Sequence, residues 1–144
     1  MPDWWCRRER PTKDETYFEN MSRVIFQTGL NWRVIDKKWP TTKKAFANFN
    51  IEKVANFTKA DVERLVKDEG IVRNKSKIEA IIYNAQGFKT IKEQFSSFQA
   101  YIDSLDKSKN YDNIVKDLIS KFKHLGPSSA KLFLYTVGEK VEAW

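Results

Sequence analysis

The sequence predicts an all-α fold of about eight helices that forms a single domain. Apolar residues recur every three to four positions along most of the chain, which is typical of helices with one buried face. Nowhere do apolar and polar residues alternate over an extended stretch, as they would in a half-buried strand. The length of 144 residues fits one domain over residues 1–144, and the chain has no internal repeat and no low-complexity segment.

Several short helices are expected in the N-terminal part of the chain. The first lies in the stretch DETYFENMSRVIFQTGLNW, with a break around Gly29. The residues expected on its buried face are Phe18, Met21, Ile25 and Phe26. Further helices are expected at 33–38, 42–48 and 51–56, with Pro40 as a boundary between the first two.

The stretch TKADVERLVKDEG predicts the next helix. Thr58 is suited to the N-cap position, and Asp61 three residues later can complete a capping box. The apolar residues of this stretch share one face around Leu65. Gly70 is expected to end the helix in the left-handed conformation that glycine adopts easily.

The C-terminal half continues the helical pattern. NKSKIEAIIYNAQGFKTIKEQF has apolar residues at helical spacing, and Gly87 within it is either tolerated or a stop. A short helix is expected at 97–105. YDNIVKDLISKFKHLG predicts another helix, which closes on Gly126.

The charge balance is basic. The chain carries 26 Lys and Arg against 19 Asp and Glu, which gives a formal net charge of +7. Basic residues far outnumber acidic ones in 33–44 and in 71–92. This distribution favours an anionic partner, and the alternative is a set of solvated helix faces with no partner.

The sequence argues against a membrane protein and against a metal site. No apolar run reaches the ~20 residues of a membrane span, and the N-terminal residues do not open a signal peptide, so we expect an intracellular protein. Cys6 is the only cysteine and His124 the only histidine, so an internal disulfide and an ordinary zinc site are both excluded. We therefore expect no metal ion and no cofactor.

The stretch KFKHLGPSSAKLFLY places a Gly-Pro break between two helices. Gly126 is expected to stop the first helix, and Pro127 suits the first position of the second. The N–H groups of Ser128, Ser129 and Ala130 would then bind an anion together with the positive end of the helix dipole. The lysines that surround the turn and favour a phosphate are Lys121, Lys123 and Lys131. The alternative is an ordinary corner between two helices.

Three stretches together resemble the 3-methyladenine DNA glycosylase I family of the helix-hairpin-helix DNA glycosylase superfamily. They are GLNW at 29–32, FANFNIEKVANFTKADVERLVKDEGIVRNKSKIEAIIYNA at 46–85 and SKFKHLGPSSAKLF at 120–133. Their order and spacing match that family over residues 17–138, and helical periodicity alone does not require the long middle pattern. The resemblance implies a helix-hairpin-helix DNA glycosylase-like domain, with the hairpin motif at about 111–138.

The resemblance also implies an activity. Such enzymes flip an alkylated purine of the 3-methyladenine type out of duplex DNA and hydrolyse its bond to the deoxyribose without cutting the strand. The expected partner is double-stranded DNA with an alkylated or abasic site, and the expected state is a monomer. The protein would work where the DNA is, in the cytoplasm and nucleoid or in a nucleus.

Site residues follow from the family match position by position. Gly29 and Leu30 match the loop whose leucine fills the gap left in the base stack, and Trp32 matches an aromatic residue of the base pocket. Without the family match, Trp32 would be assigned to the core. The residues that match the phosphate-binding hairpin or flank it are Lys123, Leu125, Gly126, Ser128, Ser129, Ala130 and Lys131.

The chain departs from the family at the base pocket. The family carries a glutamate eight residues before the tryptophan, and here that position is Val24, which cannot accept a hydrogen bond. The base must then be read by another group or not at all. Candidates are the amide of Gln27, the carboxylate of Glu19 and a stacking surface supplied by Trp5 or Trp4.

The family's zinc site of two Cys and two His is absent as well. The wider superfamily includes enzymes with a catalytic Asp beyond the hairpin, where this chain has only Glu139 and Glu142, and neither can be named as the general base. The alternative function is therefore a catalytically weak or inactive helix-hairpin-helix protein that binds DNA or damaged DNA. A helical protein-interaction domain is the third interpretation.

Overall fold

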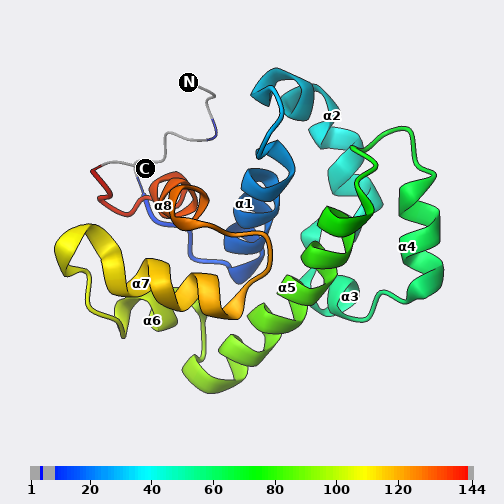
Figure 1. Cartoon of the computed structure of the whole chain (residues 1–144). Coiled ribbons are helices and arrows are strands. Elements are labelled where there is room, and N and C mark those ends of the chain that lie inside the picture. Colours follow the sequence, from blue (N-terminus) through cyan, green and yellow to red (C-terminus); the bar gives the residue numbers. More distant parts are fainter. Residues whose placement is uncertain (1–3, 5–8, 143–144) are drawn as a thin grey trace.

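The computed structural model describes Trp4 and residues 9–142, and it confirms the all-helical prediction (Figure 1). Eight α-helices and the short 3₁₀ helix η2 occur in this part of the chain, with no strand. The elements are α1 (Asp14–Gln27), α2 (Trp32–Ala45), η2 (Ala47–Phe49), α3 (Ile51–Ala55), α4 (Lys59–Val66), α5 (Lys75–Phe95), α6 (Phe98–Asp103), α7 (Ser108–Lys121) and α8 (Pro127–Thr136). None of these helices combines the length and the apolar character that a membrane crossing needs.

The long helix α5 crosses the middle of the molecule (Figure 1) and packs against α1, α3, α4 and α6. Its apolar residues recur at helical spacing, so they all face these neighbours. The completely buried ones include Ile78, Ile81, Ala85 and Phe88. Helix α8 packs in turn against α1 and α7, so α1 lies between the hairpin helix and α5.

Aromatic side chains join α6 and α8 to α5. Phe88 of α5 stacks on Phe98 of α6 with ring centroids 4.5 Å apart, and Phe98 meets Phe133 of α8 edge-on at 5.9 Å. All three rings are completely buried. Each such ring contributes roughly 2–3 kcal/mol by leaving water, so this cluster holds the orientation of α8 against the core.

The prediction of two helices at 33–38 and 42–48 is wrong, because α2 continues through Pro40. Proline lacks the N–H that would donate to the carbonyl of Asp36, but Asp36 is exposed and water can satisfy that carbonyl. The buried Trp39 holds the helix against the core at this point. The chain then leaves the helix at Ala45, three residues before the predicted end.

The capping box at the start of α4 is confirmed, since the N–H of Thr58 donates to Asp61 Oδ2 at 2.8 Å. The predicted left-handed C-cap at Gly70 is wrong. Helix α4 ends at Val66, and the glycines with positive φ in the described chain are Gly29 and Gly138. A Cβ on Gly70 would lie 3.0 Å from the Cβ of Thr41, so the close approach of α2 accounts for the glycine.

The prediction that Gly126 closes α7 is wrong too. Helix α7 ends at Lys121, and Gly126 is instead the N-cap of α8, with extended backbone at φ −109° and ψ −177°. The backbone reverses earlier, at His124, whose φ is 61°. Pro127 occupies the first position of α8, as predicted. Gly87 does not stop α5, which runs on to Phe95.

Candidate nucleic-acid interface

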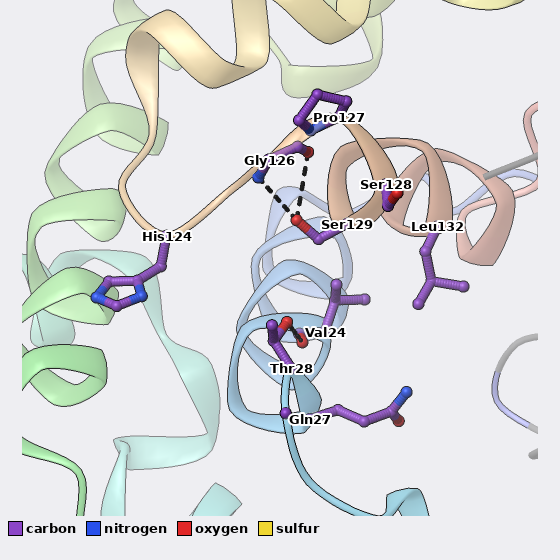
Figure 2. A pocket seen from close by; sticks show the side chains of 10 residues that line it. Val24, Gln27, Thr28, His124, Gly126, Pro127, Ser128, Ser129 and Leu132 are labelled. Carbon is purple, nitrogen blue, oxygen red and sulfur yellow. Dashed lines mark hydrogen bonds between the residues drawn. The ribbon is translucent and has the colours of Figure 1, made fainter.

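The hairpin between α7 and α8 ends in a helix N-terminus with few internal partners. The N–H of Gly126 donates to Ser129 Oγ at 2.8 Å, and Ser129 Oγ also lies 3.3 Å from the carbonyl of Gly126 (Figure 2). The N–H of Ala130 donates to that same carbonyl at 2.9 Å, so the expectation that it is free for an anion is wrong. The N–H groups of Ser128 and Ser129 have no backbone acceptor among the described residues and remain available.

The surface around this helix end is open. A Cβ added to Gly126 would meet no atom within 4 Å, and Ser128 is exposed. Lys123 is exposed beside it, with its Nζ 4.2 Å from the ring centroid of Tyr83. Lys131 is half-buried on α8, whereas the Nζ of Lys121 is paired with the carboxylate of Asp117 at 2.8 Å. An approaching phosphate therefore meets bare backbone N–H groups and unpaired lysine charge.

A pocket of about 490 Å³ lies between this helix end and the C-terminal end of α1 (Figure 2). Its described lining residues are Val24, Gln27, Thr28, Gly29, His124, Gly126, Pro127, Ser128, Ser129 and Leu132. None of these residues carries a carboxylate, and the imidazole of His124 is their only ring apart from proline. Val24 and Leu132 give the pocket apolar wall surface, while the Gln27 amide, the hydroxyl groups and the backbone of the hairpin supply its polar groups.

Val24 and Gln27 form the α1 side of the pocket. Val24 is only 1% exposed, so its side chain belongs to the core as much as to the pocket wall. Gln27 lies almost one helical turn further along, and its Oε1 is buried without a hydrogen-bond partner in the described structure. A buried acceptor without a partner is costly, so Gln27 Oε1 is a candidate contact for a donor group on a ligand.

The loop after α1 brings the predicted plug residues to the same place. Gly29 has φ 79°, the left-handed conformation that glycine adopts without strain, and it lines the pocket. Leu30 follows it and is 43% exposed, which is unusual for a leucine. The structure therefore places Gly29, Leu30 and the hairpin on one side of the molecule.

Other predicted pocket residues lie elsewhere. Trp32 begins α2, is half-buried, and has the guanidinium of Arg33 5.1 Å from its ring; it does not line the pocket. Glu19 accepts a hydrogen bond from Trp39 Nε1 at 2.9 Å and lies 3.4 Å from the Nζ of Lys43, outside the pocket. Trp5 lies outside the described residues.

Trp4 lies against Arg23, which is a structural contact. The guanidinium of Arg23 sits 4.6 Å from the ring of Trp4 and 5.0 Å from the ring of Trp39, and it also binds Asp36 at 2.5 Å. Burial between the two rings lowers the pKa of Arg23. This stack holds Trp4 against Arg23 of α1, which in turn contacts Trp39 and Asp36 of α2.

Sequence reasoning missed Thr28, His124, Pro127 and Leu132 as pocket residues. Leu132 could have been found, because it follows Ser128 by four residues and so lies on the same face of α8. His124 carried no comparable signal, since its place at the pocket depends on its positive φ. Among the described residues, no group of three or more His, Cys, Asp or Glu side chains is arranged to hold a metal ion.

Comparison with known proteins adds to this geometry. The family model of methyladenine glycosylase matches residues 3–133 of the chain. The DNA-3-methyladenine glycosylase of Haemophilus influenzae is 32% identical over 103 residues, which cover 72% of this chain and 56% of that protein. DNA-3-methyladenine glycosylase 1 of Escherichia coli is 35% identical over 91 residues, which cover 63% of this chain and 49% of that protein. The chain thus matches only about half the length of these two relatives.

A solved structure shows the same likeness in three dimensions. The chain superimposes on the 3-methyladenine DNA glycosylase I of Staphylococcus aureus with a TM-score of 0.79 and 28% sequence identity. The match covers 91% of this chain and 79% of that one. The similarity therefore extends through the helices that carry the hairpin and the pocket.

Proposed function

This chain belongs to the methyladenine glycosylase family, and on that basis we propose that it is a DNA glycosylase that removes alkylated purines of the 3-methyladenine type from duplex DNA. In this proposal it flips the damaged base out of the helix and hydrolyses the N-glycosidic bond, leaving the strand uncut. The observation that carries the proposal is the meeting of the plug loop at Gly29 and the bare N-terminus of α8 at one pocket.

The hairpin suits a grip on the DNA backbone. The free N–H groups of Ser128 and Ser129 and the positive end of α8 attract a phosphate, and Gly126 leaves room for the sugar beside it. Lys123 adds a charge that is exposed to solvent. Contacts of this kind do not depend on the base sequence, as a repair enzyme that searches all DNA requires.

The pocket suits a base that is already a good leaving group. A 3-methyladenine nucleotide carries a positive charge, and the base departs neutral when its bond to the sugar breaks. No proton donor is then needed, which fits a pocket whose described lining contains no carboxylic acid. In this proposal the Gln27 side chain rotates so that its buried, unpartnered Oε1 accepts a hydrogen bond from the amino group of adenine, a role that Val24 cannot fill.

Base release from alkylated duplex DNA tests this function directly. The protein is incubated with methylated duplex DNA, and the released bases are separated by liquid chromatography. We expect free 3-methyladenine to appear faster than from DNA incubated alone, with no nicked strands before alkali treatment. Release no faster than the spontaneous rate, even with protein in excess over lesions, would refute the proposal.

A second candidate is a protein that binds damaged DNA without removing the base. The buried Val24 and the missing carboxylate in the described pocket lining favour it, because no anionic group there offsets the charge of a cationic base. It predicts tight, salt-sensitive binding to a duplex with an abasic site and no base release from methylated DNA. The base-release assay and a binding titration on the same preparation therefore separate the two functions.

A further inference from the structure

Helix α5 contacts both elements of the DNA interface through buried polar side chains. Lys77 reaches the end of α1, just before the plug loop, and Asn84 reaches the hairpin. Both residues are almost completely buried, at 8% and 1% exposure. Polar side chains that are this deeply buried nearly always have hydrogen-bond partners, so the partners indicate what each residue does.

Lys77 caps the C-terminal end of α1. Its Nζ donates to the carbonyl of Thr28 at 2.7 Å and to that of Phe26 at 3.2 Å. These carbonyls lie at the negative end of the helix dipole, where a cation binds well. Burial lowers the pKa of Lys77 from its ordinary value of 10.5, which shows that the ammonium group loses hydration here. Its two hydrogen bonds fix the backbone that leads into Gly29.

Asn84 holds the hairpin backbone at a single residue. Its Oδ1 accepts from the N–H of Lys123 at 2.8 Å, and its Nδ2 donates to the carbonyl of Lys123 at 3.1 Å. Both backbone groups of Lys123 are thereby satisfied by one side chain, three residues before the N-cap of α8. A second contact supports this one, since Ser76 Oγ lies 2.8 Å from Nε2 of His124.

The separation of Lys77 and Asn84 along α5 relates the position of the plug loop to that of the hairpin. Lys77 and Asn84 are seven residues apart, which is about two turns, so they lie on one face of the helix and are separated by roughly 10 Å along its axis. An α-helix packed on several sides changes its length very little. The distance between the plug loop and the hairpin is therefore set by α5.

We propose that Lys77 and Asn84 are positioning residues that hold the plug loop and the hairpin at the separation at which one duplex engages both. Lys77 acts on the loop that enters the base stack, and Asn84 acts on the phosphate grip. This inference depends on the proposed role of the chain in binding damaged DNA.

The two residues have different expected effects on binding. Lys77→Met should lower the preference for a duplex with an abasic-site analogue over an intact duplex by about tenfold, while intact-duplex affinity changes less than about twofold. Asn84→Asp keeps the acceptor for Lys123 N–H but loses the donor. This variant should bind both the abasic and the intact duplex more weakly, by about the same factor, and its binding should depend less on salt.

Gln86→Met is the matched control, because the Gln86 amide donates to the carbonyl of Ala55, on α3, away from both DNA elements. Its binding should equal that of the natural chain. Thermal unfolding and circular dichroism of every variant show that each is folded, and Lys77→Gln replaces Lys77→Met if the latter unfolds. Amide hydrogen exchange in residues 28–30 should increase in the Lys77 variant and stay unchanged in the Asn84 variant.

An unchanged preference for the abasic duplex in a folded Lys77 variant would overturn the proposal, as would equal effects of Lys77→Met and Gln86→Met. Failure of the glycosylase function gives a different result. In that case the natural chain binds the abasic duplex but releases no base, and the separate effects of Lys77 and Asn84 on binding persist.

Discussion

Arg10 Nε lies 2.7 Å from Oε2 of Glu139, so an ion pair joins the segment before α1 to the segment after α8. The side chain of Glu139 is only 2% exposed, and its other oxygen lies 2.8 Å from Nζ of Lys107 and accepts from the hydroxyl of Tyr111. The carboxylate oxygens of Glu139 therefore both bind other side chains of the protein. Glu139 does not line the pocket beside the hairpin.

Replacing Glu139 should destabilise the protein. Glu139→Gln leaves Arg10 and Lys107 without their buried partner, and we expect the free energy of unfolding to fall by about 2–3 kcal/mol. Urea unfolding followed by circular dichroism measures the change. Glu142→Gln is the control, because Glu142 is exposed and should shift the value by less than about 0.5 kcal/mol. Equal effects of the two variants would contradict the role given to this ion pair.

Acid should weaken the contact between Arg10 and Asp103. The Arg10 guanidinium donates to both oxygens of Asp103, at 3.1 and 2.7 Å, and holds the pKa of that carboxyl below its ordinary value of 3.8. A pKa lowered by folding contributes stability above pH 3.8 that is lost as the pH falls through the folded-state value. Asp103→Asn should therefore cost up to about 1 kcal/mol at neutral pH, since the carboxylate is partly exposed. In urea titrations this difference from the natural chain should shrink as the pH falls below 3.8 and vanish once the pH is below the folded-state pKa of Asp103.

Gly126→Ala should impair DNA binding without affecting the fold. The backbone at Gly126 is extended, which any residue adopts, and a Cβ there would meet no atom of the chain within 4 Å. The added methyl group would instead occupy the space that a phosphate and its sugar need. We expect an unchanged melting temperature and a loss of duplex affinity of about tenfold, measured by fluorescence anisotropy. Unchanged affinity would show that the backbone does not approach DNA here.

Charge reversal at Lys123 and Lys131 should weaken binding to every DNA sequence alike. Each lysine that loses a phosphate contact should reduce the slope of log affinity against log salt by about one unit. Lys53→Glu serves as the control, because it changes the net charge by the same amount as Lys123→Glu. Lys53 is an exposed residue of α3 and is distant from the hairpin in the sequence. A salt slope that falls as much in the control as in Lys123→Glu would point to net charge alone.

Gln27→Met should separate base recognition from DNA binding. Methionine preserves the length of the side chain but cannot accept a hydrogen bond well, so a flipped adenine loses its contact with Oε1. We expect base release to slow about tenfold or more, while affinity for intact duplex stays within about twofold. Kinetics of base release with excess protein, compared with a binding titration, measures the two effects. Equal release rates would remove Gln27 from the pocket proposal.

Periodicity predicted the helices well because most of them bury a single face. The apolar faces around Ile25, Leu65, Ile81 and Leu118 are all buried as expected. The boundary errors at Pro40, Gly70 and Gly126 have two causes. At Pro40 and Gly70 a local rule for proline or glycine was outweighed by packing or by the close approach of another helix. At Gly126 the rule failed because the chain already reverses at His124, so that the glycine is the N-cap of α8.

The site was predictable only in part. The hairpin carries a local signal, the Gly-Pro helix start, whereas the plug loop was predicted only from the family match of GLNW. The polar supports Lys77 and Asn84 have no such signal, because their partners lie 49 and 39 residues away in the chain. The positions of Trp32 and Glu19 outside the pocket depend in the same way on how α1 and α2 cross.

The sequence by itself determined that this chain is helical, basic and similar to a glycosylase family, since periodicity, charge and local motifs do not require knowledge of distant contacts. Only the tertiary structure decided that Val24, Gln27, Gly29 and the start of α8 line one pocket, and that α5 contacts both the end of α1 and the hairpin. The physical reason is that a pocket consists of surfaces from segments far apart in the chain, whose meeting depends on how the whole core packs.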